Sequence, residues 1–127
     1  MGFYKMRKYR NIVTEIDGHK FDSRKEAKYY LVLRDRLQHG EISNLRMQVP
    51  YELAPAIYED EIKHLKTKDK VVRKCVQRAV QYVADFVYTD NASGEEKVID
   101  TKGFRTKEYI VKKKILRALK GIAIIEI

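Results

Sequence analysis

The sequence predicts an α/β protein, and three observations support this prediction. Residues 23–40 and 106–121 have the capping residues and the apolar spacing that are typical of helices. Other segments alternate apolar and polar residues, as strands with one exposed face do. The sequence contains no internal repeat or low-complexity tract, and we expect its 127 residues to form one compact domain.

The first elements are expected to be a hairpin and a helix. Residues 14–21 have the pattern of a tight hairpin with Asp17 and Gly18 at its turn, because this pair tolerates the backbone that a two-residue turn needs. Ser23 is the expected N-cap of the first helix, which ends near Gly40.

Strands are expected in the rest of the chain, apart from the second helix. Residues 45–53 alternate as a strand exposed on one face, and Pro50 favours a position at the edge of a sheet. Residues 79–89, 97–103 and 122–127 complete the set of expected strands. Residues 54–75 fit no single element, so their structure stays open.

The two central strands are expected to bring two carboxylates together. A turn centred on Asn91–Gly94 pairs residues whose numbers sum to 185, which places Asp85 opposite Asp100. Directly opposed side chains lie about 5 Å apart, and like charges there destabilise a sheet. Mg²⁺ or Mn²⁺ would offset this repulsion, because carboxylate oxygens are preferred ligands of both ions. Lys102 would share the face of Asp100 and could add a positive charge.

A structural explanation of these residues is also open. A register shifted by one residue would turn one of the two acids to the other face of the sheet. Lys102 could then simply form a salt bridge with Asp100.

Glu26 is a candidate third carboxylate. On a helical wheel it lies at the centre of an apolar stripe with Tyr30, Leu33 and Leu37, and therefore faces the core. The alternative is a capping box, because Ser23 and Glu26 have the spacing in which a glutamate caps the start of its own helix.

Charge distribution predicts a polyanionic partner. The net charge is +9, and Lys and Arg are concentrated in residues 1–10, 63–78 and 105–120. Nucleic acid is the leading candidate, although each cluster could instead be a solvated lysine face. The single cysteine, Cys75, excludes an internal disulfide. No stretch has the length and apolarity of a membrane span or signal peptide, so we expect a soluble, intracellular protein.

Several motifs in order resemble a known family. The segments "KYRN", "FDSRKEAKYY", "YVADFVY" and "KVIDTKGF" resemble a phage and prophage family of the PD-(D/E)XK nuclease superfamily, similar in its site to Holliday-junction resolvases. The resemblance implies a restriction-endonuclease-like αβα core, in which helices flank a mixed central β-sheet. Asp100 departs from close relatives, which often have Glu there, and residues 56–75 look like an insertion.

The resemblance also implies roles for the candidate site residues. Asp85, Asp100 and the backbone carbonyl of Thr101 would bind Mg²⁺ or Mn²⁺. Glu26 would add a ligand or hold a water molecule nearby. Lys102 would orient the attacking water or stabilise charge on the phosphate.

The second helix is the expected DNA contact. Its apolar residues are expected to be buried, leaving the basic side free for phosphates. The residues expected to be buried are Ile110, Val111, Ile115, Leu116 and Leu119. The residues expected to bind DNA are Lys107, Lys112, Lys113, Arg117 and Lys120.

These observations lead to two hypotheses from different classes. The first is a metal-dependent endonuclease, selective for DNA structure, that acts as a homodimer in the cytoplasm of a bacterial host. The second is a non-enzymatic, basic, nucleic-acid-binding phage protein whose acids are structural. Residues 63–74 could be a DNA-contacting arm or a solvated loop. Gln48 could reach the site, or could be an ordinary polar residue on a half-solvated strand.

Overall fold

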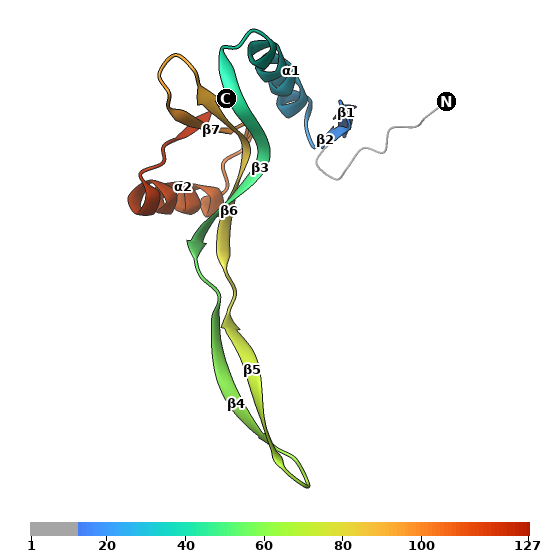
Figure 1. Ribbon diagram of the computed structural model, residues 1–127, viewed down its shortest axis with the longest axis vertical. Helices are drawn as coiled ribbons and strands as arrows, with labels where there is room; N and C mark the ends of the chain where they lie inside the picture. Colours follow the sequence, from blue (N-terminus) through green and yellow to red (C-terminus); the bar gives the residue numbers. More distant parts are fainter. Residues whose placement is uncertain (1–12) are drawn as a thin grey trace, which may run out of the picture. The chain divides into compact units, whose positions relative to one another are not determined.

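The computed structural model describes residues 13–127, so the predicted basic arm at residues 1–10 lies outside the described residues. The described chain contains a four-stranded mixed sheet, two two-stranded sheets and two helices (Figure 1). This arrangement confirms the predicted α/β class with a mixed central sheet. The elements are β1 (Thr14–Ile16), β2 (His19–Phe21), α1 (Arg24–Gln38), β3 (Ile42–Ala54), β4 (Ile57–His64), β5 (Asp69–Gln77), β6 (Val80–Asp90), β7 (Glu96–Asp100), α2 (Lys107–Lys120) and β8 (Ile124–Glu126).

The chain divides into two compact units, a subdivision that the sequence did not predict. The first unit contains the described residues up to Val49, together with Ala84–Phe104 and Ile124–Ile127. The second contains Pro50–Val83 and Arg105–Ala123. Strands β3 and β6 contribute residues to both units, and the candidate catalytic and metal-binding residues, Glu26, Asp85, Asp100, Thr101 and Lys102, all lie in the first.

Strands β1 and β2 form the hairpin that the sequence predicts. Thr14 pairs with Phe21, and Asp17 and Gly18 form the turn with φ angles of 53° and 80°. Positive φ at both turn residues is the geometry of a type I′ hairpin. Asp17 Oδ2 also accepts hydrogen bonds from the Tyr30 hydroxyl at 3.0 Å and from Arg34 Nη1 at 2.8 Å, which tie the turn to helix α1.

Helix α1 begins after the predicted N-cap, Ser23, and ends near Gly40 as predicted. The Glu26 backbone N–H donates to Ser23 Oγ at 3.1 Å, which satisfies one of the free donors of the first turn. The helix ends before Gly40, whose φ of 72° suits glycine.

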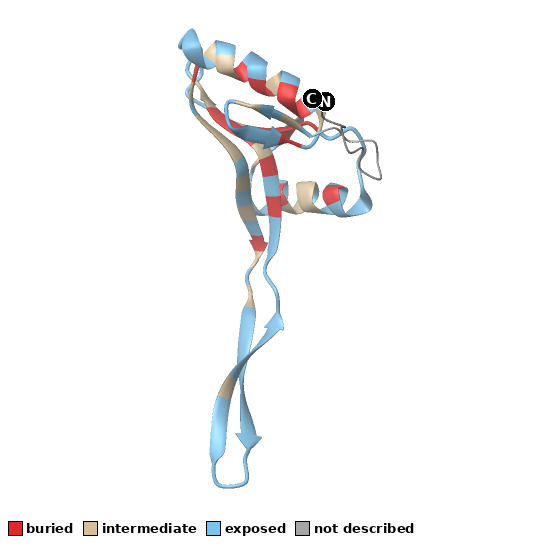
Figure 2. Cartoon of the chain, turned by 90° about the vertical axis from the view of Figure 1, so that its right-hand side faces the viewer, coloured by how far each residue is buried: buried red, intermediate tan, exposed pale blue. Residues whose placement is uncertain are grey.

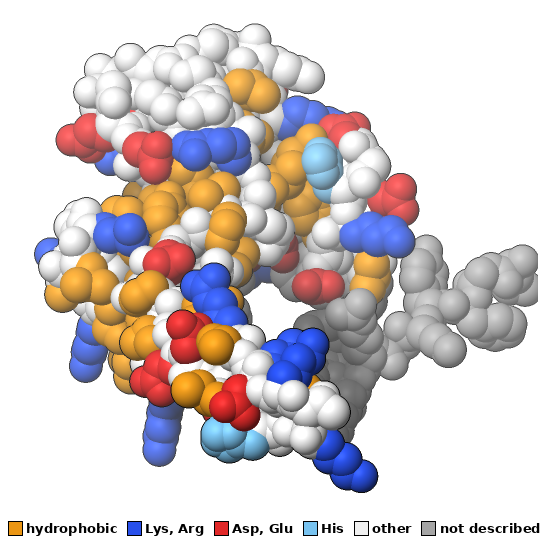
Figure 3. Space-filling model, turned by 60° about the horizontal axis from the view of Figure 1, so that its bottom comes forward, with side chains coloured by type: hydrophobic (Ala, Val, Ile, Leu, Met, Phe, Trp, Pro, Cys, Tyr) orange, Lys and Arg blue, Asp and Glu red, His pale blue; other side chains and the backbone are white. Residues whose placement is uncertain are grey.

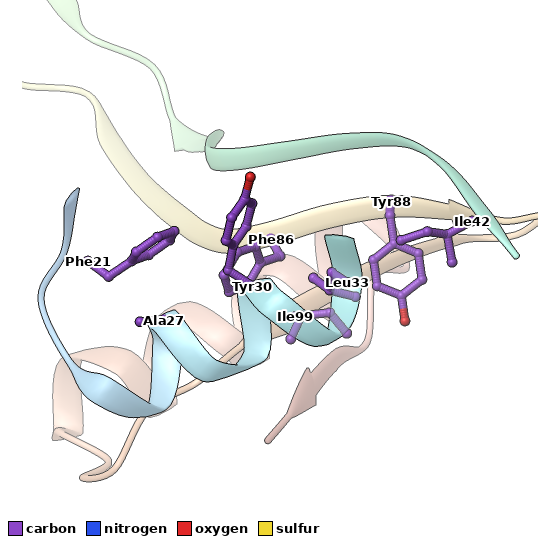
Figure 4. Packing of buried hydrophobic residues seen from close by; sticks show 8 residues of the cluster. All are labelled: Phe21, Ala27, Tyr30, Leu33, Ile42, Phe86, Tyr88 and Ile99. Carbon is purple, nitrogen blue, oxygen red and sulfur yellow. The ribbon is translucent and has the colours of Figure 1, made fainter. Parts of the chain in front are cut away.

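One face of α1 packs on the sheet to form the core of the first unit (Figure 4). Leu33 and Phe86 are 0% exposed at the centre of this cluster. Leu37 was predicted to share the buried stripe, but it is 41% exposed because it lies one turn beyond Leu33, near the end of the helix. The core cluster consists of Phe21, Ala27, Tyr30, Leu33, Ile42, Phe86, Tyr88 and Ile99.

Strands β6 and β7 have the predicted register. Phe86 pairs with Ile99 and Thr89 pairs with Glu96, so paired residue numbers sum to 185. Strand β7 ends at Asp100 rather than continuing to residue 103 as predicted.

Strand β8 completes one side of the sheet. It pairs in parallel with β7, and the Ile127 N–H donates to the Asp100 carbonyl at 2.9 Å. The final strand therefore borders the candidate site through the backbone of Asp100.

Strand β3 is an edge strand, as Pro50 predicts. It begins earlier than expected, at Ile42. Asn44 and Gln48 have φ angles of 53° and 52°, a backbone conformation that is uncommon for residues other than glycine. Irregularities of this kind occur at β-bulges, which redirect side chains.

Residues 54–75, for which no element was predicted, lie largely in a two-stranded hairpin in the second unit. Strands β4 and β5 pair antiparallel, with Tyr58 opposite Cys75 and His64 opposite Asp69. The hairpin is exposed along both strands, and only Val72 is half-buried (Figure 2). Residues 56–75 are therefore an ordered ribbon that contributes almost nothing to a core.

Helix α2 begins after its cap Thr106 and ends before Gly121, as predicted. Leu116 is buried as expected, but Ile110, Val111 and Leu119 are 39%, 53% and 63% exposed, so their predicted burial is wrong. Tyr109 and Leu116, two turns apart, define the buried side of the helix, and the three exposed residues lie on its other sides. Neither helix within residues 13–127 is long and apolar enough to cross a membrane.

Candidate active site

Asp85 is joined to the end of strand β7 by two hydrogen bonds. Its Oδ2 accepts from the backbone N–H of Thr101 at 2.8 Å and from Thr101 Oγ1 at 2.9 Å. A side chain therefore takes the backbone donor that would otherwise continue the strand. This contact explains why β7 ends at Asp100, and it holds the first predicted acid beside the second.

Asp100 is 0% exposed and lies next to Lys102. The Lys102 Nζ is 3.6 Å from Asp100 Oδ2, and the lysine side chain is 35% exposed. Lys102 lies beyond the end of the strand, so the predicted alternation along β7 does not hold it there. The ion pair nevertheless brings the two side chains together, and the ammonium group offsets part of the cost of burying the carboxylate.

Glu26 reaches the site from helix α1. It is 8% exposed, and its Oε1 accepts a hydrogen bond from Gln48 Nε2 at 3.1 Å. Burial raises the pKa of Glu26 to about 7, and the negative charges of Asp85, Asp22 and Asp100 act in the same direction. The hydrogen bond from Gln48 lowers this pKa but does not offset burial. Glu26 therefore changes its charge near neutral pH.

The site has oxygen ligands of the kind that bind divalent cations, but these ligands are not arranged around one metal position. In the part of the chain from Val13 to the end, no group of three or more His, Cys, Asp or Glu side chains is arranged to hold a metal ion. The three acids instead contact Thr101, Lys102 and Gln48. Carboxylate oxygens are the ligands that suit Mg²⁺ and Mn²⁺, so the residues fit such an ion chemically.

The sequence analysis left the role of Gln48 open and gave Phe104 no role. Gln48 contacts Glu26 from a backbone conformation that simple strand alternation does not predict. Phe104 follows Lys102 by two residues and is 80% exposed. The available signal for Phe104 was its place as the last residue of the segment "KVIDTKGF", which also contains Lys102.

The predicted DNA-contacting residues lie on α2, in the second unit. Lys107, Arg117 and Lys120 are exposed, and Lys113 is half-buried. Lys112 is half-buried too and forms an ion pair with Glu108 at 2.8 Å.

Replacing Thr101 with valine tests the contact between Asp85 and the end of β7. The change keeps the shape of the side chain and removes one hydrogen bond to a carboxylate, so we expect the free energy of unfolding to fall by about 1–2 kcal/mol. Urea unfolding would measure it. Thr67→Val, at an exposed turn, is the control and should change stability by less than about 0.5 kcal/mol. Equal effects of the two variants would contradict the structural role of Thr101.

The fold and the site together define a mixed α/β protein in which Asp85 of β6 and Asp100 of β7 lie beside Lys102, with Glu26 supplied by helix α1. Residues 6–121 match a protein family described as a protein of unknown function, DUF1064. The chain belongs to this family. Comparisons with curated proteins and with solved structures found no match.

Proposed function

We propose that this protein is a metal-dependent endonuclease of the PD-(D/E)XK type that hydrolyses phosphodiester bonds in DNA. The observation that supports the proposal most strongly is convergence. Asp85 bonds to the residue after Asp100, Lys102 forms an ion pair with Asp100, and the charges of both acids act on Glu26. A protein whose acids were only surface charges would have no need to bury Glu26 and Asp100 together.

The residues that would hold the metal are Asp85 and Asp100, with the carbonyl of Thr101 and the carboxylate of Glu26. A bound Mg²⁺ or Mn²⁺ supplies a water of lowered pKa and neutralises charge on the phosphate. Asp85 contributes an oxygen already fixed by Thr101, and Asp100 contributes one held beside Lys102. Preorganised oxygens lower the cost of assembling such a site.

Glu26 and Lys102 have complementary roles in this proposal. Where Glu26 holds a water molecule rather than binding the ion directly, its carboxyl group, with a pKa of about 7, can accept a proton from that water at neutral pH. The partly exposed Lys102 ammonium group can reach the scissile phosphate and stabilise the negative charge that develops on it.

The proposed substrate is DNA with a branched structure, and the proposed active form is a homodimer. Both proposals depend on the resemblance to Holliday-junction resolvases, since a junction presents two symmetric strands. The basic residues of α2 are proposed to contact phosphates without reading sequence. The exposed ring of Phe104 offers a surface on which a nucleobase can stack.

A second candidate is a DNA-binding protein without catalytic activity. Each acid already has a partner within the chain, and this favours a structural role for the cluster. The two candidates differ in one result, which is strand cleavage that depends on a metal.

A cleavage assay separates the two candidates. The protein is incubated with a labelled four-way junction or a matched duplex, in Mg²⁺, Mn²⁺ or EDTA. Paired nicks at symmetric positions of the junction are expected with either metal and not with EDTA. Asp85→Asn should abolish them, because an amide is a poorer metal ligand than a carboxylate. Binding without cleavage in every metal would leave the non-enzymatic candidate.

A further inference from the structure

The β4–β5 hairpin carries its charges in two separate zones. Near Tyr58, acids and bases face one another, with Glu59 opposite Lys74 and Asp60 opposite Arg73. Lys74 Nζ lies 4.0 Å from Glu61 Oε2, and the Arg73 guanidinium lies 4.3 Å from the centroid of the Tyr58 ring. The charges of this zone are balanced within the hairpin.

The turn end of the hairpin is basic instead. We name it the lysine tip and define it as Lys63, Lys66, Lys68 and Lys70. The only acid among residues 63–70 is Asp69, which bonds to His64 Nδ1 at 2.8 Å. Residues 63–70 are all exposed, and Figure 3 brings this end of the chain toward the viewer, with basic side chains extending into solvent.

The pairing within the tip is unfavourable for the hairpin alone. Lys63 and Lys70 are directly opposed across the two strands. Like charges at opposed positions lie about 5 Å apart and destabilise the pair of strands. A two-stranded ribbon is already marginal in water, and this one buries almost no apolar surface. An anion between the two ammonium groups would turn this repulsion into attraction.

We propose that the lysine tip binds the phosphate backbone of double-stranded DNA. A two-stranded ribbon has the width that the major groove of B-DNA admits, and lysines along both strands can then reach phosphates on either side. Lysine is a flexible point charge, so these contacts secure the duplex without reading its sequence. The proposal requires DNA binding but not cleavage, and it is therefore tested separately from the catalytic proposal.

Two charge-removing variants test the tip. Lys66→Gln with Lys68→Gln changes the turn outside the strand pairing, and Lys63→Gln with Lys70→Gln removes the opposed pair. The matched control is Lys20→Gln with Lys28→Gln, which removes two exposed charges from the β1–β2 hairpin and from the side of α1 opposite Glu26. Binding to a labelled duplex of about 30 base pairs is measured in EDTA over a range of salt concentrations.

We expect each tip variant to lower affinity by roughly tenfold or more near 0.1 M salt, and to reduce the slope of log affinity against log salt by about 2. The control should stay within about twofold of the wild type. Thermal unfolding should show that Lys63→Gln with Lys70→Gln does not weaken the fold, because a like-charge pair has been removed. Loss of binding without loss of stability is a result that a structural role would not give.

Three results would overturn the proposal. The first is an equal loss of affinity in the tip variants and the control. The second is wild-type protein that does not bind the duplex. The third comes from phosphatidylserine vesicles mixed with the same proteins: tip variants that lose vesicle binding but keep DNA binding would assign the tip to a membrane surface. An inactive wild type whose DNA binding depends on the tip would overturn only the proposed nuclease function.

Discussion

Replacing Lys102 with alanine is expected to lower the rate of metal-dependent DNA cleavage by at least about 100-fold, because one preorganised charge on the reacting phosphate commonly contributes this much. The wild-type ammonium group is 3.6 Å from Asp100 Oδ2 and reaches solvent from a site that is otherwise largely buried. Single-turnover cleavage of the preferred substrate, at saturating protein, measures the chemical step apart from DNA binding.

The control for this experiment is Lys97, which lies on strand β7, five residues before Lys102. Lys97 forms an ion pair with Glu95 at 2.8 Å, so Lys97→Ala also removes a paired lysine. It should leave the cleavage rate within about twofold of the wild type, because Lys97 contacts none of the candidate acids. A Lys102→Ala protein that cleaves as fast as Lys97→Ala would show that Lys102 serves only to neutralise Asp100.

Replacing Glu26 with glutamine is expected to stabilise the protein while abolishing its proposed activity. The carboxyl group has an ordinary pKa of 4.5 and a folded-state pKa of about 7. Below pH 4.5 it is protonated in both states, so burial carries no charge penalty. Between pH 4.5 and 7 the carboxyl group ionises in the unfolded chain but stays protonated in the folded protein, so about 3 kcal/mol of stability is lost by pH 8, where both states are ionised. Glutamine is never ionised and keeps an oxygen that can accept from Gln48.

Thermal unfolding in EDTA, at about pH 4.5 and about pH 8, measures this effect. The Glu26→Gln protein should unfold roughly 10 °C higher than the wild type at the upper pH and at nearly the same temperature at the lower pH. Glu41→Gln is the control, since Glu41 is exposed, and it should have little effect at either pH. A Glu26→Gln gain that did not depend on pH would contradict the assignment of a buried, ionising carboxyl group.

Short-range rules were sufficient to predict most of the first unit. Asp17 and Gly18 fix one hairpin, and Ser23 and Gly40 bound the helix. The loop after Asp90 sets the β6–β7 register, which pairs Phe86, the residue after Asp85, with Ile99, the residue before Asp100. Each of these depends on residues close together in the chain, where backbone geometry leaves few alternatives.

The remaining features depend on contacts between distant residues. The end of β7 was misjudged because Asp85 captures the N–H of Thr101 across the sheet. The hydrogen bond from Gln48 to Glu26 is made from a backbone conformation with positive φ at Gln48, which is uncommon within a strand. On α2, Tyr109 takes a buried position and packs against Tyr82, which an apolar count does not predict. Long-range competition of this kind is not visible in local patterns.

The β6–β7 hairpin also has a consequence for how the site assembles during folding. Asp85 and Asp100 are on the two arms of one hairpin, and such a local element forms in about 1–10 μs. Glu26 is brought in only when α1 packs on Phe86 and Ile99, a contact of far greater sequence separation and slower closure. Two of the three acids thus become neighbours early, and the third joins them at the step that completes the core.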